Sequence, residues 1–202
     1  MTRRRSLLLT LPALPALAAP VRAQDAAAAV VERFHAVLLE VMRNARQLGI
    51  RGREERLRPA MQAAFNLPAM ARIAVGPPWA QMSQAEQQAL AQAFADWSVA
   101  TYAARFDGYG GESFETTGEN RLPNGDTLVR TQLNRPNEAP VALNYLLRQQ
   151  NGQWRIVDIY LAGSISELAG RRAEFATLLR EGGAERLTAE LRQRTERLRQ
   201  GA

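Results

Sequence analysis

Three short turns divide residues 113–161 into four segments of similar length, and they limit the fold more than any other feature of the chain. The first turn contains Asn124-Gly125, a pair that tolerates the positive φ angles of a type I′ turn. This turn therefore predicts a tight hairpin. Connections this short join antiparallel neighbours only. We therefore predict an antiparallel meander sheet of four strands, or slightly more, over residues 114–122, 127–134, 141–149 and 154–161. The turns themselves are Pro123-Asn124-Gly125-Asp126, Arg135-Pro136-Asn137-Glu138 and Asn151-Gly152.

Helical periodicity precedes this meander. Asp25 is suited to cap a first helix, whose apolar residues recur at helical spacing until Gly49 and Gly52 end it. A second helix follows, and then a short third helix over residues 67–74. The prolines at Pro77-Pro78 prevent the third helix from continuing.

A long helix leads into the meander, and two more helices follow it. Ser83 and Glu86 form a capping box at the start of a helix over residues 84–106. The apolar arc of this helix is wider than one contact surface needs, which predicts that it touches two surfaces. Periodic apolar residues predict closing helices over residues 165–178 and 187–198. Helices on both sides of an antiparallel meander indicate a single α+β domain.

The first residues have the three parts of a secretory signal peptide. They are a positive run at Arg3-Arg4-Arg5, an apolar core over residues 6–19, and small side chains at Val21-Arg22-Ala23, where we expect cleavage after Ala23. The apolar core is far shorter than the ~20 residues that span a bilayer. We therefore predict a signal peptide at 1–23 and one exported, soluble domain at 24–202. An uncleaved anchor or a mitochondrial presequence is the alternative, and both ordinary and twin-arginine export stay open.

The excess of positive charge belongs mainly to this leader. The chain has 26 basic and 20 acidic side chains, and removing the leader's four arginines leaves 22 against 20. The remaining arginines are scattered among acidic residues, whereas nucleic-acid binding needs clustered positive charge. We therefore expect no nucleic-acid partner.

The chain offers few groups for catalysis or metal binding. It has no cysteine, which excludes disulfides and thiolate metal sites. His35 is the only histidine and lies beside Phe34 on an apolar helix stripe, so any Ser-His-Asp set would depend on it. Gly163-Ser164 is not part of a nucleophile elbow, and residues 108–111 lack the spacing of a phosphate loop. We expect no catalytic residues, no metal and no cofactor.

Asp158 is the one acidic residue in an otherwise apolar strand. A buried carboxylate is unfavourable unless it is paired or hydrogen-bonded. Two interpretations stay open: a structural hydrogen bond to a neighbouring turn or helix N-terminus, and contact with a ligand.

The third and fourth strands are apolar on both faces. Such strands need cover on both faces, or a cavity on one of them. The wide apolar face of the long helix is able to supply the opposite wall. A well-filled core and a ligand pocket are both compatible with this pattern.

Several segments, in order, resemble the MlaC-type periplasmic lipid-binding proteins, also called the toluene-tolerance auxiliary family. The resemblance covers nearly all of residues 25–195. It is carried by Phe65-Asn66-Leu67-Pro68-Ala69-Met70-Ala71-Arg72, Val75-Gly76-Pro77-Pro78-Trp79, Ser83 with Gln87, Phe94, Tyr102-Ala103, Tyr109-Gly110-Gly111-Glu112, Trp154-Arg155-Ile156-Val157-Asp158-Ile159, Gly163-Ser164-Ile165-Ser166, Phe175, Gly182-Gly183, Leu187 and Leu191.

The chain departs from the family pattern at three places. Ser164 and Ser166 lie one position away from the pattern, Arg155 replaces the lysine that usually follows the tryptophan, and Gly76-Pro77-Pro78-Trp79 is an unusual form of its segment. The phospholipid branch and the hopanoid-associated branch, HpnM, therefore both stay open.

The resemblance implies helices packed on a curved antiparallel sheet around a deep hydrophobic pocket. It implies a non-catalytic, monomeric carrier whose cargo is a phospholipid or a hopanoid. The carrier would exchange lipid with an inner-membrane transporter complex and an outer-membrane lipoprotein complex. Arg72, Arg105 and Arg148 are candidates for binding a head-group phosphate. The candidate pocket residues are Phe94, Trp97, Tyr102, Phe106, Val141, Leu143, Tyr145, Ile156 and Ile159.

Two other functions compete with the carrier. One is an enzyme with a cone-shaped pocket of the NTF2-like kind, in which Asp158 would act. The other is an adaptor subunit of an envelope lipid-transport complex, with a filled core and no bound lipid.

Overall fold

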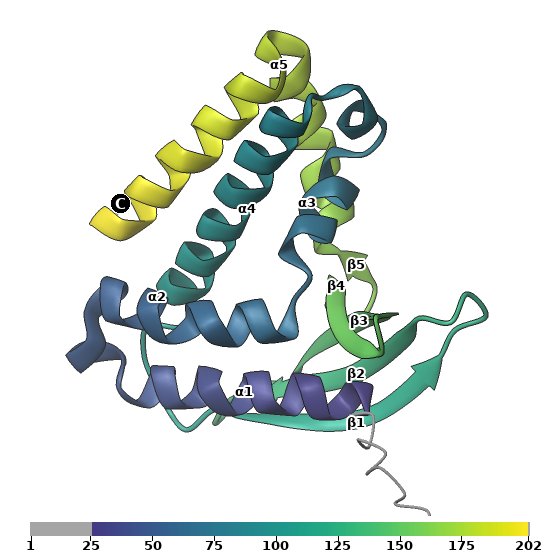
Figure 1. Ribbon diagram of the computed structural model, residues 1–202. Coiled ribbons are helices and arrows are strands. Elements are labelled where there is room, and N and C mark those ends of the chain that lie inside the picture. Colours follow the sequence, from purple (N-terminus) through teal and green to yellow (C-terminus); the bar gives the residue numbers. More distant parts are fainter. Residues whose placement is uncertain (1–25, 202) are drawn as a thin grey trace, which may run out of the picture.

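The computed structural model describes residues 26–201 and shows the predicted α+β architecture. An open, five-stranded antiparallel sheet with strand order β1-β2-β3-β4-β5 packs against the helices (Figure 1). The predicted signal peptide and the predicted cap at Asp25 lie outside the described residues. Between residues 26 and 201 no helix is both long and apolar enough to cross a membrane.

The four predicted strands are confirmed to within one residue at each end, and a fifth short strand follows them. The fifth strand pairs with Tyr160 and Leu161. Ile165, predicted to begin a closing helix, lies in this strand and is 62% exposed. The strands are β1 Ser113–Arg121, β2 Thr127–Asn134, β3 Val141–Gln150, β4 Gln153–Leu161 and β5 Ile165–Ser166.

The type I′ turn occurs at Asn151-Gly152 and not at Asn124-Gly125. Asn151 and Gly152 both have positive φ angles, of 50° and 77°. In the first hairpin only Gly125 has a positive φ, and its amide donates to the Leu122 carbonyl at 2.9 Å. Proline at the second position favours a type I turn, here followed by a glycine bulge. The type I′ prediction for that hairpin was therefore wrong.

An extra residue in β4 decides which side chains face the helices. Leu146 is opposite Asp158, whereas Leu147 is opposite Ile156, so Val157 forms a bulge. Strict alternation would place Ile156 and Ile159 on opposite faces of the sheet. The bulge brings both to the helix-facing side.

The first helical segment breaks earlier than predicted. Helix α1, Ala27–Arg43, begins after Ala26 without a side-chain cap and ends at Asn44. Helix α2, Ala45–Ala64, contains a kink at Gly49, which has φ 60°. Gly49 and Gly52 therefore lie inside α2 and do not separate the two helices. Both helices lie over one face of the sheet (Figure 1).

The next elements follow the prediction closely. They are helix α3, Leu67–Val75, the short helix η1, Pro77–Gln81, and helix α4, Gln84–Arg105. The capping box of α4 is present: the Ser83 amide donates to the Glu86 carboxylate at 2.7 Å, and the Glu86 amide donates to Ser83 Oγ at 3.3 Å.

The two closing helices are the two arms of helix α5, Glu167–Gln200. Gly182 and Gly183 depart from helical geometry, and the second arm turns back along α4 (Figure 1). Near its end, Arg199 donates to both oxygens of the buried Glu54 carboxylate. This ion pair joins the second arm to α2, and α5 also packs against α4 and β4.

Candidate functional site

An apolar cavity of about 130 Å³ lies between the end of α2, α3, α4, the first arm of α5 and the helix-facing side of β3 and β4. Its apolar lining is Met61, Phe65, Leu67, Met70, Phe94, Trp97, Tyr102, Phe106, Leu143, Ile159, Leu161 and Leu168. Five further lining residues are polar or charged: Ser98, Thr101, Arg105, Glu167 and Arg171.

Helix α4 forms the longest wall of the cavity. Its lining residues recur three and four positions apart, so they form one face of the helix. Ser98 donates its hydroxyl to the Phe94 carbonyl at 2.7 Å, and Thr101 donates to the Trp97 carbonyl at 2.8 Å. Because both hydroxyls already donate hydrogen bonds within the helix, this wall does not need a polar partner from a molecule in the cavity.

An aromatic cluster closes one side of the cavity. Phe34 packs edge-on against Phe65 and Tyr102, with ring centroids 4.9 and 5.5 Å away, and Phe106 stacks on Tyr102 at 5.5 Å. Behind this cluster, His35 Nε2 lies 2.9 Å from the Tyr145 hydroxyl. The cluster therefore separates the cavity from a buried polar pair in the core.

Three charged residues, Arg105, Glu167 and Arg171, line the cavity. Arg171 lies over the Trp97 ring at 4.8 Å from its centroid, with its nitrogens 3.7 Å from Glu167 and 3.5 Å from Glu174. Arg105 is exposed at the end of α4. Burial raises the pKa of Tyr102, and the charges of Arg105 and Glu167 act on the same hydroxyl with opposite signs. The Tyr102 hydroxyl therefore stays protonated at neutral pH.

The sequence as a whole matches one protein family. The family model described as MlaC protein matches residues 32–193, which is most of the chain. The chain belongs to the MlaC family. Among solved structures, the phospholipid-binding protein from Ralstonia solanacearum in complex with a phospholipid is 21% identical, with a TM-score of 0.75. That match covers 85% of this chain and 98% of the Ralstonia chain, and it shows that the two share a fold. No curated protein matches the chain.

Six of the nine candidate pocket residues line the cavity of this MlaC family member. Three come from α4, one directly follows α4 and two come from the sheet; they are Phe94, Trp97, Tyr102, Phe106, Leu143 and Ile159. Their contact with a lipid stays a prediction.

The other three candidates lie outside the cavity lining. Tyr145 is fully buried behind the aromatic cluster, with its hydroxyl directed at His35. Ile156 is also fully buried, and at this point of β4 the Asn66 amide donates to the Ile156 carbonyl at 2.9 Å and Phe65 forms a β-bridge with it. Val141 is half-buried at the start of β3, two residues before Leu143 along the strand.

The three candidate phosphate-binding arginines lie in three different places. Arg105 lines the cavity. Arg148 donates to both oxygens of Asp126, at 2.9 and 2.7 Å, and lowers the pKa of that carboxyl. Arg72 borders a separate surface groove together with Trp79 and Arg172.

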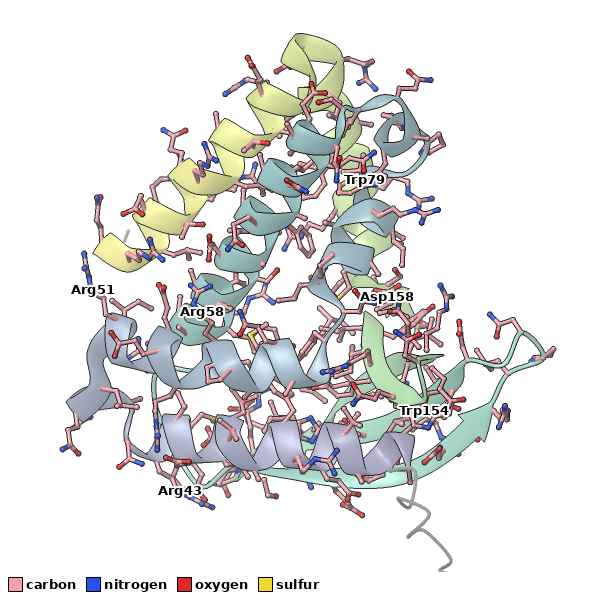
Figure 2. All side chains as sticks on the ribbon, viewed as in Figure 1. Arg43, Arg51, Arg58, Trp79, Trp154 and Asp158 are labelled. Atoms are coloured by element: carbon pink, nitrogen blue, oxygen red, sulfur yellow. The ribbon has the colours of Figure 1, made fainter. Side chains whose placement is uncertain are left out.

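Asp158 makes structural hydrogen bonds, as the first of its two interpretations predicts. Its carboxylate accepts from the Ser166 hydroxyl at 2.6 Å and from the Leu168 amide at 3.4 Å, and it is not part of the cavity lining. Figure 2 shows Asp158 on β4 close to the start of α5. Asp158 therefore anchors the first arm of α5, and with it Glu167, against the sheet.

Sequence reasoning missed the contribution of α3 and α5 to the cavity. Leu67 and Met70 belong to the segment that carries the family resemblance, which was a usable signal. Glu167 and Arg171 had no such signal, because charged residues near a helix start are usually solvated. Within residues 26–201 no group of three or more His, Asp or Glu side chains is placed to hold a metal ion.

Proposed function

We propose that this MlaC family member is a soluble periplasmic lipid carrier. Acyl chains or a hopanoid would bind in the apolar cavity, and the protein would move lipid between the inner and outer membranes. The observation that carries the proposal is a cavity with a predominantly apolar lining. Family membership supports it, as does the shared fold with a Ralstonia protein solved in complex with a phospholipid.

Burial of an acyl chain supplies the binding energy without any catalytic group. Each buried methylene contributes about 0.8 kcal/mol. The cavity lining offers no nucleophile with an adjacent base: its two aliphatic hydroxyls donate to helix carbonyls, and His35 lies behind the aromatic cluster. We therefore propose a binding protein and not an enzyme.

Lipid uptake must widen the cavity. At about 130 Å³ the cavity is close to the size of an engineered cavity of roughly 150 Å³ that binds one benzene. A whole acyl chain is longer than that. Phe65 and Leu67 also line a neighbouring surface groove, which contains Trp79 and several glutamines. Displacing these two side chains would join the cavity to the groove and lengthen the site.

The proposal extends to cargo, partners and compartment. A phospholipid and a hopanoid both remain candidate cargoes. An inner-membrane transporter complex and an outer-membrane lipoprotein complex are the proposed partners of a monomeric carrier. Export by the predicted signal peptide is tested by fractionation: full-length protein should collect in the periplasm, and deletion of residues 2–23 should retain it in the cytoplasm.

The decisive test of the carrier is lipid uptake by the purified protein. Protein from its native host is extracted for lipid mass spectrometry, and stripped protein is then incubated with phospholipid vesicles. We expect about one lipid per chain in both experiments. Protein that is free of lipid from the host and takes none from vesicles would refute the carrier and favour a ligand-free adaptor.

A matched pair of variants tests the site itself. Ser98 lines the cavity, whereas Ala104, also half-buried on α4, lines neither the cavity nor the neighbouring groove. Ser98→Phe should fill the cavity and reduce uptake at least tenfold, whereas Ala104→Phe should leave most of it. Circular dichroism and thermal unfolding check that both variants fold. Equal loss in both variants, or a loss confined to Ala104→Phe, would place the lipid outside this cavity.

A further inference from the structure

A positively charged groove lies apart from the cavity, where α3, η1, α4 and the first arm of α5 meet. Among the described residues its lining contains two arginines, Arg72 and Arg172, the apolar side chains of Ile73, Pro77 and Trp79, and no acidic side chain. Part of this lining is the Gly76-Pro77-Pro78-Trp79 segment, which departs from the family pattern. Arginine, tryptophan and the absence of carboxylates together predict a surface that attracts anions.

Contacts place the two arginines in the same groove, although they come from different helices. Arg172 of α5 donates to the Ile73 carbonyl of α3 at 2.7 Å, and Ile73 directly follows Arg72. The Arg172 side chain also lies against Gly76, where an added Cβ would be 3.4 Å from Arg172 Nε. Both arginines are exposed, and neither has an ion-pair partner among residues 26–201. Their positive charges are therefore uncompensated within the protein.

Trp79 is held at the edge of this groove (Figure 2). Its amide donates to the Gly76 carbonyl at 3.0 Å, and Gln87 of α4 donates to the Trp79 carbonyl at 2.9 Å. The tryptophan side chain is half-buried, and the adjacent Pro77 is exposed. Tryptophan is favoured at the boundary between water and lipid, where its ring contacts apolar groups and its N–H stays hydrated.

Shared side chains connect this groove to the cavity. Trp79 and Gln87 also line the glutamine-containing groove beside the cavity. Phe65 and Leu67 in turn line both that second groove and the cavity. A lipid that entered beside Trp79 would therefore meet the two side chains whose displacement lengthens the site.

We infer that Arg72, Arg172, Pro77 and Trp79 form a docking face for an anionic membrane surface. The two arginines bind lipid phosphates, and Trp79 with Pro77 enters the interfacial layer of the bilayer. Charge complementarity selects this occupant, because a guanidinium binds a phosphate strongly and anionic leaflets attract basic groups. The inference rests on the proposed function, in which the carrier meets two membranes, and it names the side of the carrier that faces them.

An acidic protein surface is the competing partner, since arginine also pairs with carboxylates. Vesicles made only of lipid separate the two partners. A membrane-docking face binds such vesicles without any protein component, whereas a face built for a protein does not.

Sedimentation with lipid vesicles measures the docking. The purified protein is mixed with vesicles of phosphatidylcholine, either alone or with about one third phosphatidylglycerol, and should sediment with the anionic vesicles only. High salt should weaken this binding by screening. The double variant Arg72→Gln with Arg172→Gln should bind about 25-fold more weakly, at about fivefold for each arginine. Vesicles of brominated lipid should quench the tryptophan fluorescence of the wild type more than that of Trp79→Phe.

The matched control is Arg46→Gln with Arg51→Gln, which removes the same net charge from α2. Both arginines are exposed and have no ion-pair partner in the described part of the chain, and Figure 2 shows Arg51 well away from Trp79. The control should bind vesicles as the wild type does. An equal loss in both double variants would show that only net charge matters, and it would overturn the inference.

Lipid uptake is measured separately, with lipid supplied in detergent and counted by mass spectrometry. Uptake by a wild type that does not bind anionic vesicles would overturn the docking face and leave the carrier intact. Binding to purified envelope complexes in the absence of vesicle binding would assign the face to a protein partner instead. Vesicle binding without lipid uptake would contradict the proposed function and leave the docking face standing.

Discussion

At the scale of single residues, His35 shows how a group that suggests catalysis can belong to the core. The imidazole is 4% exposed, stacks on Phe114 with ring centroids 4.0 Å apart, and lies 2.9 Å from the Tyr145 hydroxyl. Burial lowers its pKa from 6.5 to about 4. The imidazole is therefore neutral in the folded protein at neutral pH, and protonating it opposes folding.

This burial predicts a pH dependence of stability. The pKa of His35 is lower in the folded state than in the unfolded state, so the unfolded chain binds the proton first as pH falls. Stability is fully present above about pH 6.5 and declines toward pH 4. Between pH 7 and 5.5, where carboxylates stay charged, the free energy of unfolding should fall by roughly 1 kcal/mol.

Urea unfolding at both pH values measures this change. His35→Gln keeps a polar group near Tyr145 without titrating in this range, so its free energy of unfolding should change much less. An equal decrease in both proteins would show that other groups cause it.

At the scale of elements, the break at Gly182 and Gly183 sets the directions of the two arms of α5. Gly183 has φ 65° and ψ −159°, a conformation that side chains other than glycine rarely adopt. The break lets the second arm return along α4 while the first arm stays at the cavity. Ion pairs link the arms, since Arg194 contacts Glu174 of the first arm and Glu190 of its own arm.

Alanine substitution at two glycines of α5 tests this role. Gly183→Ala should destabilise the protein by about 1–3 kcal/mol, because the backbone is strained although space is available. Gly170 lies in the regular part of the first arm with open space around its Cβ position, so Gly170→Ala should stabilise by about 0.5–1 kcal/mol. Thermal unfolding compares the two. Equal effects would show that the break carries no strain.

At the scale of the whole molecule, the cavity makes stability depend on cargo. Its walls come from α2, α3, α4, α5 and the sheet, so an occupant would contact most elements of the fold. A ligand that binds only the folded state stabilises it by mass action.

We therefore expect lipid to raise the melting temperature. At a lipid concentration of 100 times Kd, the free energy of unfolding should rise by about 2.7 kcal/mol. For a chain of this size this corresponds to an increase in melting temperature of roughly 5–10 °C. Differential scanning calorimetry of stripped and reloaded protein measures it. Ser98→Phe, which fills the cavity, should show little increase. A melting temperature that is independent of lipid in the wild type would contradict binding within the fold.

The sequence by itself determined the secondary structure and the class of fold. Turn residues and alternation located four strands, and Ser83 with Glu86 located the start of α4, because these signals act over a few residues. The spacing of Phe94, Trp97, Tyr102 and Phe106 placed them on neighbouring stripes of one helix, and all four line the cavity. Asn44 and Gly49 are both able to end a helix and lie close together, and the boundary between α1 and α2 was predicted wrongly.

Only the tertiary structure decided which residues meet. The bulge at Val157 depends on pairing with β3, and it alone places Ile156 and Ile159 on one face of the sheet. The hydrogen bonds of Asp158 to the start of α5 bring Glu167 and Arg171 to the cavity beside α4. The packing of α5 beside α4 joins segments far apart in the chain, and no local pattern encodes it. The charged residues of the cavity lining therefore became visible only in the folded molecule.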